Sequence, residues 1–175
     1  MKTKSLGLVL ILSLLAPAAV RAGGAANVTV TFDHPEKFTD VKDSFVGSEK
    51  GRDAILSEIR QFIESRAKSY LHEGQQLEVT FTDIDLAGDY EPQHGPQWQD
   101  VRIVKGIYPP RLQLEFKLTG ADGRVIGEGK RKLTDLDFQD RVLPPTNMSE
   151  SLRYEKDLLN DWMREDLKPA QNAGQ

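Results

Sequence analysis

Hydrophobic and polar residues alternate along several short stretches of this chain, and that spacing predicts β-strands. Val28, Val30 and Phe32 alternate with two threonines, so one face of the segment is apolar and the other is polar. Four further segments are also predicted as strands. The five predicted strands cover residues 28–32, 77–81, 101–107, 112–118 and 125–133.

A helical period replaces this alternation in two places. From about Arg52 to Leu71 the apolar residues fall on one arc of a 3.6-residue helix, and Gly74 follows where a C-terminal cap belongs. A second amphipathic helix is expected to start at Asn147-x-x-Glu150, which has the form of a capping box, and to run to about Asp166.

The order of these elements, β-α-β-β-β-β-α, predicts an α+β fold. We expect a mostly antiparallel sheet with two helices packed on one face, and a hairpin turn at A-D-G (121–123) between the last two strands. The basic run Lys130 to Lys132 suits an exposed edge strand, where charge discourages pairing with other chains. A single domain is predicted for residues 23–169, followed by a disordered tail at 170–175.

The first 22 residues have the form of a secretory signal peptide. Lys2 and Lys4 precede an uncharged apolar run from Leu6 to Leu15, and V-R-A (20–22) offers a cleavage site. The apolar run is shorter than the roughly 20 residues that cross a bilayer, so no transmembrane segment is predicted in the mature chain. We therefore expect a periplasmic protein. The absence of cysteine means that packing, not disulfides, must stabilise it.

Composition and motifs exclude several classes of function. The chain has 27 acidic and 23 basic residues, so it lacks the basic excess that nucleic-acid binding needs. It has no zinc-protease motif, nucleophile elbow, phosphate loop or dinucleotide fingerprint, and His34, His72 and His94 are scattered. We predict no cofactor and no enzymatic activity.

An abrupt run of acids follows the strand at 77–81. Strict alternation would send Asp83 and Asp85 to the same face as Phe81, and Ile84 to the opposite face. A β-bulge near Thr82 or Asp83 would return the apolar residues to the core and is the preferred interpretation. The alternative is a calcium site, with candidate ligands Asp83, Asp85, Asp89 and Glu91.

Two charged residues fall on the apolar arcs of the predicted helices. Arg66 lies on the arc of the first helix, and Glu155 lies on that of the second. An unpaired buried charge is very costly. The two residues are therefore predicted either to form a structural ion pair or to extend separately to solvent.

Gly127 and Gly129 lie two apart and leave a flat patch on one face of a predicted strand. Trp162 of the last helix is a candidate to pack on this patch. The alternative is that the two glycines mark only a bend or a bulge.

Several segments resemble a family of bacterial exported proteins, catalogued as domain of unknown function family 3016. The resemblance covers nearly all of the mature chain and implies export and a single domain, but no activity, because the family has none established. A fold-level analogy also links the element order to small α+β modules of envelope assembly proteins. The matching segments are V-T-V-T-F-D-H-P-E-K-F-T-D-V (28–41), D-I-D-L-A-G (83–88), V-R-I-V-K-G-I-Y-P-P-R-L (101–112), D-G-x-V-I-x-x-G (122–129) and Y-E-K-D-L-L-N-D-W (154–162).

A long polar loop from Asp89 to Gln99 carries the residues that we predict to bind a ligand or partner, namely Tyr90, His94 and Trp98. The predicted function is a non-enzymatic binding or envelope-assembly accessory module whose partner is an envelope protein or a small ligand. Two alternatives remain, a calcium-binding protein that uses the acidic run and a hydrolase of envelope glycans or peptides that uses paired carboxylates.

Overall fold

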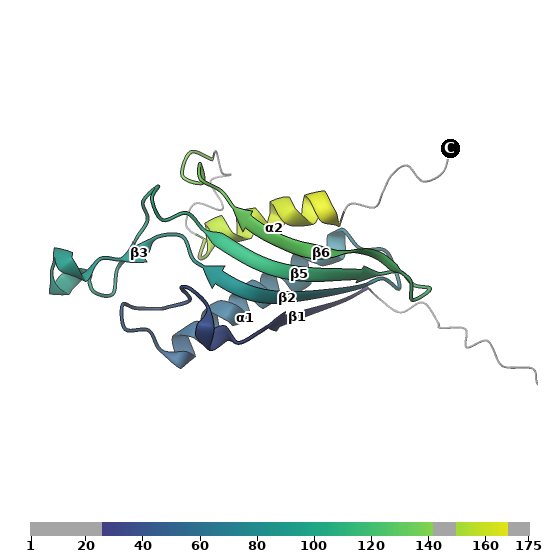
Figure 1. Ribbon diagram of the computed structural model, residues 1–175, viewed down its shortest axis with the longest axis horizontal. Coiled ribbons are helices and arrows are strands. Elements are labelled where there is room, and N and C mark those ends of the chain that lie inside the picture. Colours follow the sequence, from purple (N-terminus) through teal and green to yellow (C-terminus); the bar gives the residue numbers. More distant parts are fainter. Residues whose placement is uncertain (1–25, 142–149, 168–175) are drawn as a thin grey trace, which may run out of the picture.

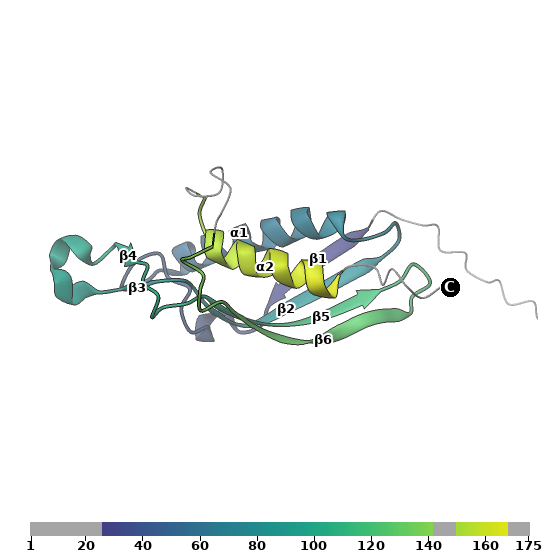
Figure 2. The ribbon, with the colours of Figure 1, turned by 90° about the horizontal axis from the view of Figure 1, so that it is seen from above.

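A four-stranded sheet with two helices on one face forms the body of the molecule (Figures 1 and 2). The computed structural model describes residues 26–141 and 150–167. The sheet strands are β1 (Asn27–Phe32), β2 (Gln76–Asp85), β5 (Arg111–Thr119) and β6 (Val125–Thr134). The helices are α1 (Glu49–Arg66) and α2 (Arg153–Asp166).

The strand order in the sheet is β1-β2-β5-β6. β1 and β2 are joined through α1 and run parallel, whereas β2 pairs with β5 and β5 with β6 in antiparallel fashion. The predicted α+β fold with a mostly antiparallel sheet is therefore confirmed. Figure 2 shows both helices on the same side of this sheet.

The core lies between the sheet and the helices. It is built from the inward positions of the strands and from one face of each helix, as the alternating and helical periods require. Phe81, Ile84 and Leu112 are fully buried on the sheet side. Ile59 of α1 and Leu159 of α2 are fully buried on the helix side.

α1 begins at a well-formed cap. The Ser48 hydroxyl accepts a hydrogen bond from the Gly51 N–H at 2.9 Å, and Asp43 in turn accepts from the Ser48 N–H and hydroxyl. The helix ends at Arg66 and continues as a 3₁₀ turn over Ala67–Ser69. The helix was predicted from about Arg52 to Leu71. The observed helix begins and ends a few residues earlier.

α2 begins at Arg153, immediately after Leu152, which has a left-handed backbone conformation with φ of 54°. The helix was predicted to start at Asn147-x-x-Glu150. Glu150 instead precedes the helix, so this part of the prediction is wrong, and Asn147 lies outside the described residues. The predicted end at Asp166 is confirmed. The predicted signal peptide (1–22) and the tail (170–175) also lie outside the described residues.

The predicted strand at 101–107 is largely absent. Only β4 (Arg102–Ile103) is extended and paired, and it pairs with β3 (Asp89–Tyr90) in a separate two-stranded ribbon. The chain then turns, because the Tyr108 N–H bonds to the Lys105 carbonyl at 2.9 Å. This ribbon projects from one end of the molecule (Figure 1). Three short 3₁₀ turns complete the described elements, at Pro35–Lys37, Pro92–His94 and Pro96–Trp98.

The flat patch at Gly127 and Gly129 lies beside a phenylalanine from the neighbouring strand. A Cβ atom added at either glycine would meet the Phe116 ring, at 3.8 Å for Gly127 and 3.5 Å for Gly129. Trp162 packs edge-on against that same ring, with 5.7 Å between the ring centroids. The tryptophan thus reaches this part of the sheet, but it contacts Phe116.

No helix within residues 26–141 and 150–167 combines the length and the apolar character needed to cross a bilayer.

Candidate functional site

The acidic run at the end of β2 is divided by a β-bulge. The register between β2 and β5 shifts between Phe81 and Asp83, so that Ile84 returns to the core. The bulge interpretation is therefore confirmed. Asp83 then accepts hydrogen bonds from the Thr39 N–H and hydroxyl, at 2.8 and 2.9 Å. Asp85 is paired with Arg111 at 2.9 Å.

The four acids proposed as calcium ligands do not converge. Asp89 accepts from the Tyr90 N–H, and Glu91 is buried among partners of its own. In the described part of the chain, no group of three or more acidic or histidine side chains is placed to hold a metal ion. The geometry does not support the alternative of a calcium site, because each carboxylate accepts from a different local donor.

Glu91 organises the projecting ribbon. Its carboxylate accepts from Lys105 Nζ at 2.6 Å and from the Tyr108 hydroxyl at 3.0 Å, and lies 2.6 Å from His94 Nε2. The hydrogen bond from Lys105 is the main cause of a lowered pKa at Glu91. This cluster ties the segment that follows β3 to the segment that follows β4. These contacts restrain the shape of the projecting ribbon.

A second ion pair fastens the ribbon to the body. Arg102 donates to both oxygens of Asp40, at 2.7 and 3.2 Å, and also to the carbonyls of Gly88 and Lys42. Its guanidinium lies over the Tyr90 ring, 4.7 Å from the centroid. Burial alone would lower the pKa of Arg102, but the hydrogen bonds and charge of Asp40 raise it.

Tyr90, His94 and Trp98, the residues predicted to bind a ligand or partner, differ in exposure. Tyr90 is buried under Arg102, with its hydroxyl on the Lys42 carbonyl. His94 is half exposed beside Glu91, and Trp98 is 42% exposed. Of the three predicted binding residues, Trp98 presents the largest apolar surface to solvent.

Glu155 is buried against the end of β2. Its carboxylate accepts a hydrogen bond from the Ala87 N–H at 2.6 Å, although the two residues are 68 positions apart. Burial raises the pKa of Glu155, and this hydrogen bond opposes the shift. The D-I-D-L-A-G segment and the Y-E-K-D segment therefore meet at this contact.

Arg66 does not pair with Glu155, and the predicted ion pair is wrong. Arg66 is exposed at the last residue of α1, and its Nε donates to Asn160 Oδ1 at 3.1 Å. It reaches solvent along its stem, as the alternative predicted. Glu155 instead accepts a hydrogen bond from a backbone amide near the start of α2, whereas Asn160 lies in the middle of that helix.

A hollow of about 590 Å³ opens beside Glu155, and we name it the end cleft. It lies where the start of α2, the end of β2, the loop before α1 and the ribbon meet. Segments from distant parts of the sequence thus share one concavity. Its lining includes Lys42, Asp43, Leu86, Ala87, Tyr90, Arg102, Val104, Glu150, Leu152, Arg153, Tyr154 and Glu155.

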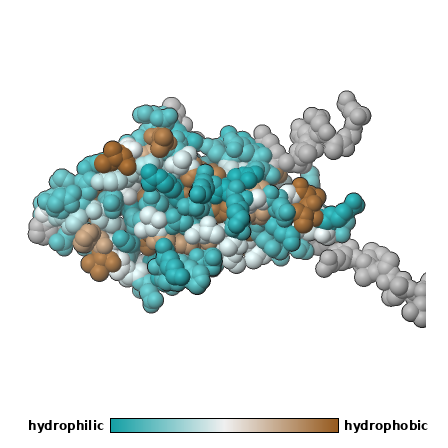
Figure 3. All heavy atoms as spheres, viewed as in Figure 1, coloured by the Kyte–Doolittle hydropathy of each residue, from teal (hydrophilic) through white to brown (hydrophobic). Residues whose placement is uncertain are grey.

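Exposed apolar side chains continue from the end cleft along two loops. The loops are joined by a hydrogen bond from the Phe45 N–H to the Gln99 carbonyl at 3.3 Å. Val46 is 88% exposed and Ile107 is 71% exposed, which is unusual for large aliphatic residues. We name these residues the apolar rim, and they are Phe45, Val46, Trp98, Val101, Val104 and Ile107. Figure 3 shows apolar groups at this end of the face in view.

Sequence reasoning missed Asp40 and Arg102, because no local period marks a pair 62 residues apart. Both lie in segments quoted for the family resemblance, 28–41 and 101–112, and those segments were the available signal. The apolar rim was also missed, since Val101 and Ile107 were assigned to a strand.

Comparisons with known proteins bear on the family of this chain. A search of curated proteins found no match. A family profile described as protein of unknown function (DUF3016) matches residues 26–165, which include both sides of the Ala87–Glu155 contact and both sides of the Asp40–Arg102 pair. The chain belongs to this family.

Proposed function

We propose that this chain is an exported, non-enzymatic binding module, and that it docks a protein partner through the end cleft and the apolar rim. One observation carries the proposal. Large aliphatic and aromatic residues remain exposed on two loops that a backbone hydrogen bond joins, and one of them, Val104, lines the end cleft. Clustered exposure of this kind marks protein interaction sites.

The loops that carry the rim are held in place. Glu91 with Lys105, and Asp40 with Arg102, restrain the ribbon before any partner arrives. A restrained loop loses less conformational entropy on binding, so more of the contact energy contributes to affinity. Loops that served only as connections would need no such restraints.

Export is supported by the N-terminal pattern of Lys2, Lys4 and the apolar run from Leu6 to Leu15. The partner is then a protein of the periplasm or of the envelope. Charge supports a protein partner over a nucleic acid, because the chain has a formal net charge of −4.

The hydrolase remains the second candidate, and one observation favours it. The end cleft is lined by three acids, Asp43, Glu150 and Glu155, and the pKa of Glu155 is raised. It ranks second because all three have partners. Asp43 accepts from the cap of α1, Glu150 pairs with Lys156, and Glu155 accepts from Ala87.

Site-specific photo-crosslinking in producing cells tests the docking proposal. We expect a crosslinker at Trp98 and one at Val46 to give the same adduct, since both side chains belong to the rim. A crosslinker at Lys68, which is exposed just beyond the end of α1 and away from the rim, is the control and should give none (Figure 1). Equal adducts at all three positions, or none at the two rim positions, would contradict the proposal.

A variant experiment separates docking from hydrolysis. The double change Trp98→Ala and Ile107→Ser should abolish the Val46 adduct while leaving the melting temperature near that of the wild type, because both side chains are exposed. If purified protein instead releases fragments from envelope glycan or from peptides, and folded Glu155→Gln does not, the hydrolase is the better account.

A further inference from the structure

β6 is a long, uncovered edge of the sheet. It has ten residues and pairs with β5 on one side only. In residues 26–141 and 150–167, no backbone hydrogen bond links its outer side to another segment. Natural edges are usually protected by a short strand, a proline or charged side chains, lysine above all. β1, the other edge, has only six residues, whereas β6 is longer and contains no proline, and its protection against unrelated strands is its charged residues Glu128, Lys130, Arg131 and Lys132.

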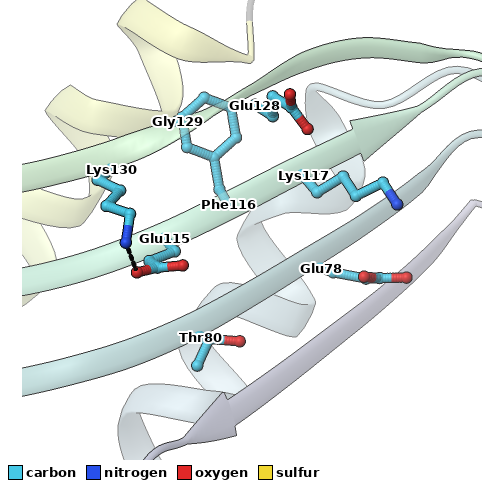
Figure 4. A pocket seen from close by; sticks show the side chains of 8 residues that line it. All are labelled: Glu78, Thr80, Glu115, Phe116, Lys117, Glu128, Gly129 and Lys130. Atoms are coloured by element: carbon cyan, nitrogen blue, oxygen red, sulfur yellow. Dashed lines mark ion pairs between the residues drawn. The ribbon is translucent and has the colours of Figure 1, made fainter.

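The open face of the sheet carries an alternating row of charges that stops at β6 (Figure 4). Glu115 on β5 lies opposite Lys130 on β6, and their side chains form an ion pair at 2.5 Å. On the next row, Lys117 lies between Glu78 of β2 and Glu128 of β6. The first row thus ends with a positive charge at the edge and the second with a negative one.

These two edge charges are symmetric about Gly129. In an antiparallel pairing of β6 with its own copy, centred on Gly129, Glu128 lies opposite the second copy's Lys130, and Lys130 lies opposite its Glu128. The alternation then runs unbroken across the axis, from Glu115 and Lys130 to the partner's Glu128 and Lys117. Cross-strand opposite charges of this kind stabilise paired strands.

Each neighbouring register creates a like-charge contact, although the axis at Lys130 also places Glu128 opposite the second copy's Lys132. Moving the axis by one residue to either side places Glu128 against Glu128, or Lys130 against Lys130. Like charges directly opposite are destabilising. The charge pattern therefore selects the axis at Gly129 over its neighbours.

The helix-side face of β6 fits the same register. Gly129 lies at the axis, where the absence of side chains lets two backbones approach. Arg131 would lie opposite the second copy's Gly127, so a bulky residue meets one with no side chain. Arg131 is itself neutralised by Asp166, with Nη2 to Oδ1 at 2.7 Å, so it adds little repulsion.

We infer that this protein forms a symmetric dimer in which β6 pairs antiparallel with β6 of a second copy about Gly129, making one continuous eight-stranded sheet. The surface is distinct from the end cleft and the apolar rim, so this inference does not depend on the proposed function. The edge charges that would repel an unrelated strand complement those of a second copy, and this match is the physical basis.

Sedimentation velocity over a wide range of concentration tests the dimer. We expect the purified protein to change from monomer to dimer as its concentration rises. Each single reversal, Lys130→Glu or Glu128→Lys, places like charges opposite each other twice per dimer and should weaken association roughly tenfold or more. The double reversal, Glu128→Lys with Lys130→Glu, restores opposite charges and should restore the dimer.

Lys68→Glu is the matched control, since this lysine is exposed beyond α1 and far along the chain from β6. It should leave association unchanged. Melting temperatures monitor folding, because both reversals also change pairs within the sheet, with Glu115 and Lys117. A wild-type protein that stays monomeric at every concentration overturns the inference, whatever the variants do. So does a dimer that the single reversals leave intact, or one that the folded double reversal fails to restore.

Discussion

The carboxylate of Glu155 accepts a hydrogen bond from the backbone N–H of Ala87 at 2.6 Å, and this contact joins the start of α2 to the end of β2. Both residues are buried, so losing either partner would leave a polar group with little access to water. The contact therefore holds the closing helix at the bulged end of the sheet, where the end cleft opens.

Replacing Glu155 with alanine should destabilise the protein by about 2–4 kcal/mol. The change leaves the Ala87 N–H without an acceptor and creates a cavity. Glu155→Gln keeps an oxygen that can accept the same hydrogen bond, so it should cost less than the alanine change. Urea unfolding of the two variants measures the difference, and equal losses would show that the hydrogen bond contributes little.

The pH dependence of stability should report the same carboxyl group. Its pKa is raised in the folded state, so the folded protein holds this proton more tightly than the unfolded chain. Its stabilising contribution is then complete below the ordinary value of 4.5 and falls as the pH rises through the raised pKa. Relative to wild type, Glu155→Gln should therefore gain stability as pH increases over that window.

Unfolding free energies at a series of pH values measure this relative gain. Glu73→Gln is a control for the loss of one carboxylate, because Glu73 is exposed in a turn. A constant difference between Glu155→Gln and wild type across the acidic and neutral range would contradict the raised pKa.

Local period was sufficient to predict most of the fold. The alternation in β1 and β5 and the arc of α1 follow from covering one face of each element, which is a local requirement. The bulge after Phe81 was predictable because Ile84 and Asp83 conflict with strict alternation. Contacts between residues far apart in the sequence were not predictable in this way. The hydrophobic period shows which face of an element is buried, but not which residues cover that face.

Glu155 and Arg66 show why such long-range contacts could not be predicted from the sequence. Both lie on apolar arcs, and opposite charge suggested a pair. Glu155 instead bonds a backbone amide, which has no signature in the sequence, and Arg66 sits at a helix end where its stem reaches solvent. Residues 101–107 have strand-like composition, yet pairing with β3 requires only two of them.

Arg66→Ala and Glu155→Ala should have additive effects on stability. The two side chains have different partners, so a double-mutant cycle should give a coupling energy within about 0.5 kcal/mol of zero. Arg66→Ala alone should cost less than about 1 kcal/mol, because its bond to Asn160 is exposed. Chemical denaturation of the wild type, the two single variants and the double variant measures the cycle. A coupling energy well above about 1 kcal/mol would support an ion pair between Arg66 and Glu155.

Arg102 should be among the residues whose replacement costs the most stability. Asp40 is buried, and Arg102→Leu would leave its carboxylate without the two hydrogen bonds that compensate for burial. Breaking one partner of a buried pair costs about 3–5 kcal/mol. The carbonyls of Gly88 and Lys42 would lose a donor in the same change.

The double change Asp40→Asn with Arg102→Leu separates the buried charge from the lost packing. If the stranded carboxylate is the main cost, the double variant should be more stable than Arg102→Leu alone, as measured by urea unfolding. Arg102→Lys should fall between wild type and Arg102→Leu, because one ammonium cannot bond Asp40 and both carbonyls in the planar geometry of a guanidinium. If Arg102→Leu instead costs less than about 1 kcal/mol, the pair does not fasten the ribbon, and the restraint invoked for the apolar rim must come from Glu91 and Lys105.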